Sequence, residues 1–572
     1  MFAQAVAFLH SLASSAAFAY VTILALQLKV LWGLWLYKDL ESGDTTYYFM
    51  NATMWHTRGL TVFSWSPLYT TFFGSMFNLS NDAYAATIAH RLVLVLSLAL
   101  LVLALLRRLL SPLIAWLMAV WWVVLPINFD AVYSVHLFAM IPILLACLAV
   151  AWCGSRWIPG SLGRGGCLGI LFGSAVLMRN ELAIPFAFFG AACVIYEIRS
   201  RREIGRRRLF WKLCHYCVPV LLAAGLSLFF YMRASDRGSI KAVMWDKHTL
   251  NVCQIYASGY RQRHPEWINN PWTECQGLME KTFGKPQLPL TEAVLRNPGA
   301  MFEHFAWNFS LLPNGVQILL FNAMSGTVNP DYLPVHIARF PVLAASFLLA
   351  GIWILGLVRS PLRWTYWWER IQPRAWIWMA LFSFAPMCAF IVATQRPRPS
   401  YLFSLSVLIM AVTGLLVESV LGPAVLSRST TLAPLIVAAV LIVTPRYYYN
   451  SEHQSPRTLL SYYRALKPFA ARLGPGQVIL MPGYGYAGEL CNRFSQPQTP
   501  PCGGLDYHDY ASLREILARK KVNLVYVDEP MLQEKATADF AETAVSQGWN
   551  CIALRLVSGN RSMLFERAPT AP

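Results

Sequence analysis

Side chains that could carry out chemistry gather in short segments between long apolar stretches. The first such segment, residues 38–83, contains the acid Asp44, followed by residues that could contact a substrate: Tyr47, Tyr48, His56, Arg58 and Trp65. Ionisable groups at membrane depth are costly and often functional, so Asp44 is a candidate site residue. Asp44 could instead only cap a following helix.

Three later segments are shorter, and each carries charge at the end of an apolar stretch. They supply the candidates Asp130 and His136, then Arg179 and Glu181, then Arg396, Arg398 and Tyr401. Arginine is planar and always charged, so these three arginines are candidates for binding an anion. Each of these charged side chains, taken singly, could simply extend to the membrane surface. Taken together, the charged segments predict one cavity on the outer side of the membrane.

The elements that position these residues are predicted to be membrane-spanning helices. Of the 572 residues, 56% are hydrophobic and only 13% are charged, whereas soluble domains carry about 25% charged residues. This composition excludes a soluble enzyme, a disordered chain and a secreted disulfide scaffold. The net charge of +18 does not indicate nucleic-acid binding, because most of the surplus lies among the apolar segments. The predicted fold class is therefore a polytopic α-helical membrane protein.

A membrane-spanning helix needs about 20 mostly apolar residues. Eleven segments approach this length: 14–37, 84–106, 112–127, 136–153, 167–178, 182–198, 213–232, 335–358, 375–393, 401–421 and 430–446. The first could be one long tilted helix, and a cleaved signal peptide is not expected because no basic residue precedes Lys29. Met178–Leu182 must form a tight turn. Apart from Lys29, we expect no charge inside the spans.

Basic residues orient these spans. With the N-terminus in the cytoplasm, the inner loops hold sixteen Lys and Arg and the short outer loops hold five, as the positive-inside rule requires. The run Arg199–Arg208 then anchors the chain at anionic lipid headgroups. Residues 38–83, 233–334 and 447–572 face the outside. There Cys253 with Cys275, and Cys491 with Cys502, are expected to form disulfides, leaving Cys551 over.

The tail is predicted to be a small α/β domain, residues 447–572, that follows a membrane module of residues 1–446. The expected elements are a strand at 477–481, a helix at 510–521, a strand at 522–528, a helix at 536–547 and a hairpin of 551–557 with 562–566. Gly483–Gly488 fits the GxGxxG pattern of dinucleotide binding, with Asp506 downstream. Three prolines follow it instead of a long helix, so we interpret it as a glycine-rich turn.

The motifs resemble those of one known superfamily. An acid after the first span, followed by Trp65-Ser-Pro67-Leu-Tyr69, looks like the GT-C membrane glycosyltransferases, in particular the branch of bacterial protein O-mannosyltransferases and aminoarabinose transferases. Arg179-Asn-Glu181 is similar to the R-P-E-type turn of that branch. Arg396-Pro-Arg398-Pro-Ser-Tyr401-Leu is similar to its R-Y-L-type start of a later span. These motifs cover about forty positions.

The resemblance implies an activity and a set of partners. The donor would be a sugar on a polyprenyl phosphate, and the acceptor would be a hydroxyl group of a glycan, lipid or protein. The reaction would invert the anomeric carbon on the extracytoplasmic face, with Asp44 as the base, or Glu41 or Asp130 if Asp44 only caps a helix. The resemblance implies that the three arginines stabilise the phosphate leaving group. Asp130 or Glu181 would orient the acceptor or an arginine. No cofactor is required by the motifs, although a divalent metal ion is an open possibility. We expect the protein in the inner membrane of a bacterium, with its active site on the periplasmic face.

Two other classes of membrane protein stay open at this point. A transporter or flippase of lipid-linked sugars would show repeated halves and charges within the spans. A polysaccharide ligase or polymerase would concentrate Arg and His in a large outer loop. In the long loop 233–334, Trp245–His248 and Trp307–Phe309 could contact substrate, but a packed lid with a disulfide is the simpler interpretation.

Overall fold

The computed structural model describes most of the chain, and the statements below concern that part. The described residues are 15–40, 45–80, 82–125, 134–152, 159–200, 206–330, 337–359, 364–429, 433–444, 446, 458–470, 478–480, 510–519, 522–533, 535–555 and 561–567. Two compact units can be separated within it. The first comprises residues 1–32, 93–232 and 236–450, and the second comprises residues 33–92, 233–235 and 451–572.

The chain is a helical membrane protein, as its composition predicts. Nine helical runs among the described residues are long and apolar enough to cross a membrane. They are α2–α3 (Ala16–Tyr37), α6 (Ala83–Leu109), α9 (Ser134–Trp152), α10 (Gly160–Leu177), η3–α11 (Asn180–Ser200), α12 (Arg206–Met232), α18 (Arg339–Arg359), α19–α21 (Trp364–Thr394) and α22 (Phe403–Ser429). The two other predicted spans correspond to shorter apolar helices, α7 (Pro112–Val124) and α23 (Ala433–Val443).

Two spans differ from the sequence expectation. The first is not one continuous helix, because α2 ends at Leu31 and Gly33 adopts a φ of 93° before α3 begins at Leu34. Glycine populates this region without a steric penalty, which explains the break. The fifth span begins at Gly160 instead of residue 167. Arg164, which we expected in an inner loop, is therefore inside a helix. The predicted turn between α10 and α11 is confirmed.

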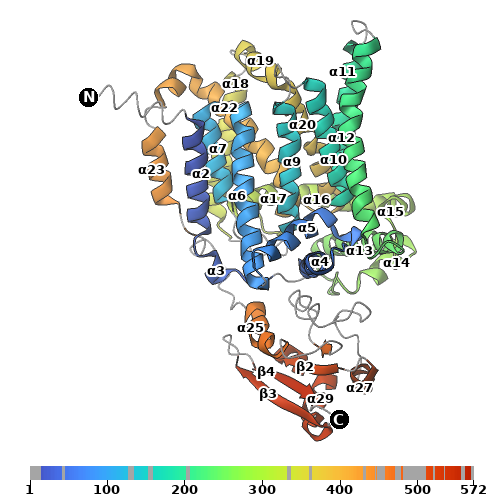
Figure 1. Ribbon diagram of the computed structural model, residues 1–572. Helices are drawn as coiled ribbons and strands as arrows, with labels where there is room; N and C mark the ends of the chain where they lie inside the picture. The colour runs from blue at the N-terminus through green and yellow to red at the C-terminus, as the bar shows by residue number, and fades with distance from the viewer. Residues whose placement is uncertain are drawn as a thin grey trace. The chain divides into compact units, whose positions relative to one another are not determined.

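Helix α10 packs against α12 through three glycines spaced four residues apart. A Cβ atom on Gly165 would lie 2.0 Å from the carbonyl oxygen of His215, and one on Gly169 would lie 2.6 Å from that of Pro219. Small residues at this spacing let helix backbones approach closely within a membrane. Pro219 lies inside α12 and has no N–H for the carbonyl of His215, four residues earlier. Figure 1 shows α9, α10 and α12 side by side.

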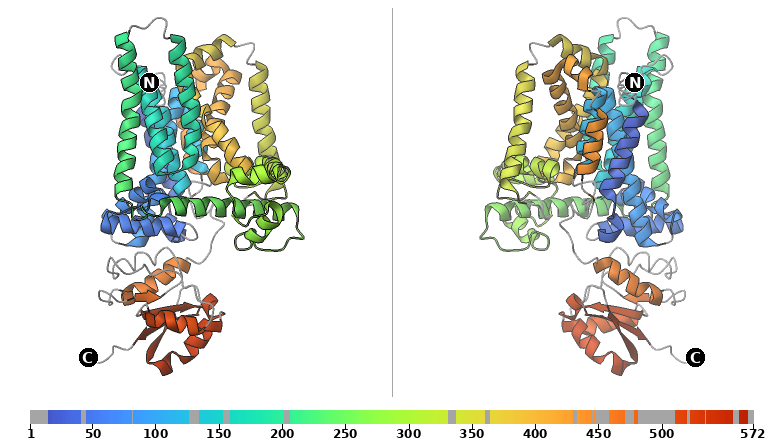
Figure 2. Two further views of the ribbon diagram at one scale, coloured as in Figure 1. Left: turned by 90° about the vertical axis from the view of Figure 1, so that its right-hand side faces the viewer. Right: turned by 90° about the vertical axis from the view of Figure 1, so that its left-hand side faces the viewer.

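A separate group of helices follows α12 in the outer loop, and we call it the loop subdomain (residues 240–321). It contains α13 (Ile240–Arg263), α14 (Cys275–Phe283), α15 (Leu290–Arg296), α16 (Pro298–Ser310) and α17 (Leu312–Phe321). The predicted disulfide between Cys253 and Cys275 is present. It lies in a core with Tyr256, Met279 and Phe283. Helix α13 runs crosswise to the spanning helices (Figure 2). The prediction of a packed, disulfide-linked loop is confirmed.

The second unit joins the first outer loop to the tail. Helix α25 (Thr458–Ala470) contacts that loop twice, since the backbone N–H of Leu460 donates to Asp39 at 2.7 Å and Lys467 pairs with Asp82 at 2.6 Å. Thr61 also pairs with the backbone of residues 233–235 at the start of the second outer loop. The first outer loop, the first three residues of the second outer loop and the tail therefore belong to one compact unit.

The tail contains the predicted α/β elements. Its sheet has the order β1-β2-β4-β3, from β1 (Val478–Leu480), β2 (Val522–Asp528), β3 (Trp549–Arg555) and β4 (Arg561–Arg567). Strand β1 is parallel to β2, and β3 and β4 form the predicted antiparallel hairpin. Helices α27 (Tyr510–Arg519), α28 (Glu529–Leu532) and α29 (Lys535–Thr543) accompany the sheet. Its core contains Phe540, Trp549 and Phe565.

Candidate functional site

Three of the predicted segments converge on the aromatic ring of Tyr401. The guanidinium carbons of Arg179 and Arg398 each lie 5.5 Å from the centre of this ring. The ring of His136, at the start of α9, meets it edge-on at 5.2 Å. Two cations near one aromatic ring are attracted to its electron-rich face. We call His136, Arg179, Glu181, Arg398 and Tyr401 the outer cluster.

Arg179 is fixed by the tight turn between α10 and α11. Its backbone N–H donates to the carbonyl of Ser174 in the last turn of α10. Its guanidinium donates to the carboxylate of Glu181 through both Nε, at 2.6 Å, and Nη2. This ion pair is partly exposed, with 18% and 22% of the two side chains accessible. Glu181 therefore orients Arg179, one of the two roles that the sequence suggested for it.

The other two arginines lie on a proline-containing turn between α21 (Phe384–Thr394) and η7 (Pro399–Tyr401). Only 8% of Arg396 and 7% of Arg398 is accessible. The N–H of Tyr401 donates to the carbonyl of Arg398 at 3.0 Å, which closes the turn. The turn therefore buries two guanidinium groups and brings one of them, that of Arg398, to the ring of Tyr401.

The predicted aromatic residues of the first loop lie in the second unit, on α4 (Thr45–Arg58), η1 (Phe63–Trp65) and α5 (Pro67–Ser75). Trp65 stacks on Tyr47 at 4.9 Å and meets Tyr48 edge-on at 5.2 Å. His56 stacks on Phe77 at 5.4 Å. Arg58 is exposed at the end of α4. These side chains pack against one another, so their proposed contact with a substrate remains a prediction.

Several sequence predictions fall on residues outside the described ranges. They include two of the three acids proposed for catalysis, Asp44 and Asp130, the glycine-rich segment 483–488 with Asp506, and the expected disulfide of Cys491 with Cys502. Among the described residues, no three His, Cys, Asp or Glu side chains form a group that could hold a metal ion. The divalent metal and the roles of the two acids therefore stay predictions.

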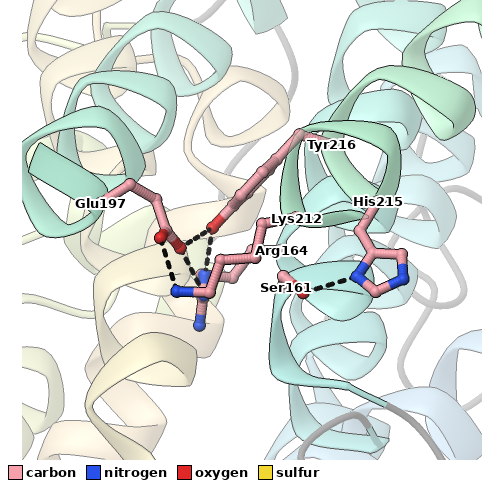
Figure 3. Close-up of polar contacts among 6 residues, drawn as sticks. All are labelled: Ser161, Arg164, Glu197, Lys212, His215 and Tyr216. Carbon is pink, nitrogen blue, oxygen red and sulfur yellow. Dashed lines mark hydrogen bonds and ion pairs between the residues drawn. The ribbon is translucent and has the colours of Figure 1, made fainter. Parts of the chain in front are cut away.

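A second polar cluster, which the sequence analysis missed, lies at the opposite end of α10 (Figure 3). We call Arg164, Glu197, Lys212 and Tyr216 the inner cluster. Glu197 on α11 accepts hydrogen bonds from Arg164, Lys212 and Tyr216, each at 2.9 Å. Arg164 also donates to the Tyr216 hydroxyl at 2.6 Å and lies over the ring of Trp376 at 4.7 Å. His215 bonds to Ser161 beside it at 2.8 Å.

The expectation that Lys29 is the only charge inside the spans is wrong. Arg91 in α6, Arg164 in α10 and Glu418 in α22 are all buried within spanning helices. Glu418 accepts from the backbone N–H of Ser111, at the start of α7, and pairs with Arg370 at 3.0 Å. Pairing with an opposite charge and with a helix N-terminus reduces the cost of burying a carboxylate. Hydropathy averaged over a span conceals such residues.

The two groups proposed in the long outer loop differ in exposure. Trp245 on α13 is 54% accessible, whereas Asn308 on α16 is 1% accessible. Trp307 donates its indole N–H to Gln262 at 2.9 Å within the loop subdomain. Asn308 is therefore buried, whereas Trp245 in the first group and Phe309 in the second, at 44%, are exposed.

Comparisons with known proteins give results of two kinds. No family model and no curated protein matches the chain. Among solved structures, the chain is similar to the apo oligosaccharyltransferase of Archaeoglobus fulgidus, with 12% identity, a TM-score of 0.43 and coverage of 94% of this chain and 72% of that one. The same protein in complex with zinc and sulfate gives 13% identity, a TM-score of 0.43 and coverage of 95% and 72%.

A third similar structure is ArnT from Cupriavidus metallidurans bound to undecaprenyl phosphate. It shows 10% identity and a TM-score of 0.40, with 96% of this chain and 98% of that chain covered. Because the identities and TM-scores are low, we base no residue role and no step of the reaction on them.

Proposed function

We propose that this chain is a membrane glycosyltransferase that moves a monosaccharide from a polyprenyl-phosphate donor to a hydroxyl acceptor on the extracytoplasmic face. The observation that carries the proposal is that the guanidinium groups of Arg179 and Arg398 both approach the aromatic ring of Tyr401. Arginine binds phosphate oxygens through paired N–H donors and keeps its charge at any physiological pH. A phosphate carried by a membrane lipid fits a cationic site at the end of spanning helices.

The proposed reaction is a single inverting displacement. The acceptor oxygen attacks the anomeric carbon, and the bond between that carbon and the phosphate oxygen breaks with its electron pair retained by the phosphate. Asp44 takes the hydroxyl proton. The arginines of the outer cluster, with Arg396 beside them, stabilise the negative charge that develops on the leaving phosphate. Glu181 keeps Arg179 in position.

Other predicted residues have supporting roles in this proposal. Asp130 or Glu181 orients the acceptor, and His136 donates to or accepts from a phosphate or sugar oxygen. Tyr47, Tyr48 and Trp65 are aromatic surfaces of the kind that stack on sugars, with His56 and Arg58 behind them. A divalent metal ion, if the enzyme uses one, would add a further positive charge beside the phosphate.

A transporter of lipid-linked sugars is the second candidate, because buried charges do occur within the spans. Glu418 is already engaged by Arg370 and by the start of α7, which suits a structural role. Transport and transfer give different products. A purified transporter would move the intact lipid-linked sugar across a vesicle membrane, whereas a transferase would release polyprenyl phosphate. A polysaccharide polymerase or ligase would lengthen or move a glycan chain.

The direct test is to incubate the purified protein in detergent with polyprenyl-phosphate sugars and hydroxyl acceptors. We expect release of polyprenyl phosphate and transfer with inversion. Asp44→Asn should give a folded protein that still binds the lipid and is on the order of 100- to 10,000-fold slower, because the general base is lost. If Asp44 only caps a helix, the same variant would lose about 1 kcal/mol of stability or less and keep its rate.

A further inference from the structure

The turn that carries Arg396 and Arg398 is held in place by the loop subdomain. It follows the last residue of α21, where the final carbonyl groups of a helix have no partner within the helix. Ala393 and Gln395 supply two of these carbonyls. Both face the side chain of Asn308, which comes from α16, 85 residues earlier in the chain.

Asn308 satisfies these carbonyls from outside the helix. Its amide nitrogen donates to the carbonyl of Ala393 at 2.8 Å and approaches that of Gln395 at 3.4 Å. The side chain is almost fully buried, with 1% accessible. A buried carbonyl that loses its donor cannot turn to water, so removal of this amide is costly. Asn308 therefore acts as a cap of α21 that another helix supplies.

His304 stands one helical turn before Asn308 and completes the arrangement. Its Nε2 lies 3.1 Å from the amide nitrogen of Asn308, which can only donate, so Nε2 must be the acceptor. Such a histidine has to be neutral. Burial, together with the positive charge of Arg263, lowers the pKa of His304 to about 4. The ring and two backbone carbonyls therefore surround the same amide nitrogen, which fixes the orientation of Asn308.

The next helix, α17, contacts the turn through Gly315. A Cβ atom at this position would lie 2.1 Å from the carbonyl oxygen of Pro397, the residue between the two arginines. That oxygen belongs to the backbone, so an added methyl group would have to displace the turn itself. Any residue larger than glycine is therefore incompatible with the present position of Arg396 and Arg398.

We infer that Asn308 and Gly315 are positioning residues, through which the loop subdomain sets the orientation of the arginines that bind the donor phosphate. The role given to these arginines rests on the proposed function, whereas the contacts do not. This assignment replaces the sequence hypothesis that Asn308 contacts substrate directly.

The first measurement is hydrogen exchange of the backbone amides, which does not depend on activity. Asn308→Ala should raise exchange in residues 395–402 at least about tenfold, because a buried hydrogen bond is lost. The matched control is Asn297→Ala, which removes an amide from the other end of α16, where Asn297 accepts from the N–H of Ala300. The control should raise exchange near residues 297–301 and leave 395–402 unchanged.

The second measurement is binding of undecaprenyl phosphate to the same proteins in detergent. Asn308→Ala should weaken binding about tenfold, and in turnover it should raise the KM for the donor more than it lowers kcat. Asn297→Ala should leave both unchanged. If the effect came from a general loss of packing, lipid binding would weaken in both variants.

A glycine pair keeps the inference testable if Asn308→Ala does not fold. Gly315→Ala should raise exchange at 395–402 and weaken lipid binding, whereas Gly277→Ala in α14, with no atom within 4 Å of the new methyl group, should change neither. Unchanged exchange at 395–402 in both Asn308→Ala and Gly315→Ala would overturn the inference. Failure of the native protein to bind the lipid would overturn the proposed function, and exchange alone would then decide the role of Asn308.

Discussion

Helix α10 has an arginine–glutamate cluster at each end, and the two clusters differ in how their charges are balanced. In the inner cluster, Glu197 lies between Arg164 and Lys212, and the hydroxyl of Tyr216 bonds to both Glu197 and Arg164. In the outer cluster, Glu181 contacts Arg179, while Arg398 lies over the ring of Tyr401. The inner cluster joins three helices, and the outer one joins the start of α9 to two turns.

This difference indicates why similar residues have different uses. The inner carboxylate accepts from three donors, so the network is complete without a ligand and serves to hold α10, α11 and α12 together. In the outer cluster, two arginines instead lie over one aromatic ring, whose face carries only a partial negative charge. We propose that this pair binds the donor phosphate. Substitutions at the two ends of α10 should therefore affect different properties.

The largest expected effect is on turnover, from Arg179 in the outer cluster and from Arg396 on the neighbouring turn. Arg179→Ala or Arg396→Ala should slow sugar transfer on the order of 100- to 1000-fold, because one preorganised donor to the leaving phosphate is lost. Both proteins should fold, as judged by gel filtration and thermal unfolding in detergent. Near-normal rates in both variants would remove these arginines from the mechanism and leave Arg58 and Arg398 to be tested.

An arginine-to-alanine substitution in the inner cluster should instead lower stability and leave the rate of transfer unchanged. Arg164→Ala leaves Glu197 without its most buried partner, and loss of one member of a buried pair costs about 3 kcal/mol of stability at the lower end of the measured range. Transfer per folded molecule should stay normal. Thermal inactivation in detergent measures the first effect, and initial rates at low temperature measure the second. A stable but inactive Arg164→Ala protein would contradict the distinction between the clusters.

A smaller effect is expected where α10 meets α12, between the two clusters. Gly165→Ala would bring a methyl group against the backbone oxygen of His215, and forced overpacking of this kind costs about 1–3 kcal/mol. The neighbouring Gly166→Ala is the matched control, because its methyl group would meet Ala149 at an ordinary 3.6 Å. Equal thermal stability of the two variants would show that the close approach of α10 and α12 is dispensable.

The smallest effect should come from the exposed edge of the inner cluster. Lys212 is 27% accessible, and Glu197 would retain Arg164 and Tyr216 after Lys212→Met. Partly exposed ion pairs contribute about 1 kcal/mol or less. The thermal midpoint should therefore fall much less than in Arg164→Ala. A drop as large as that of Arg164→Ala would mean that both cations are needed to hold the carboxylate.

Local sequence patterns determined much of the architecture. Strand β2 has the predicted bounds, Val522–Asp528, because its three valines and its tyrosine are residue types that favour a half-buried strand. The turn at Met178–Leu182, the antiparallel hairpin and the disulfide of Cys253 with Cys275 were likewise predicted, since each depends on residues close together in the chain. The length of the apolar segments also located the spans, because the thickness of the bilayer sets the length of a spanning helix.

What only the tertiary structure decided is which distant residues meet. Arg164 and Glu197 are 33 residues apart, Asn308 and Ala393 are 85 apart, and no local pattern connects either pair. The break at Gly33 and the early start of α10 also escaped prediction, because average hydropathy does not register a single change in φ or one paired charge within a helix. The sequence therefore identified the arginines, and the packing of helices around Tyr401 brought two of them to the same ring.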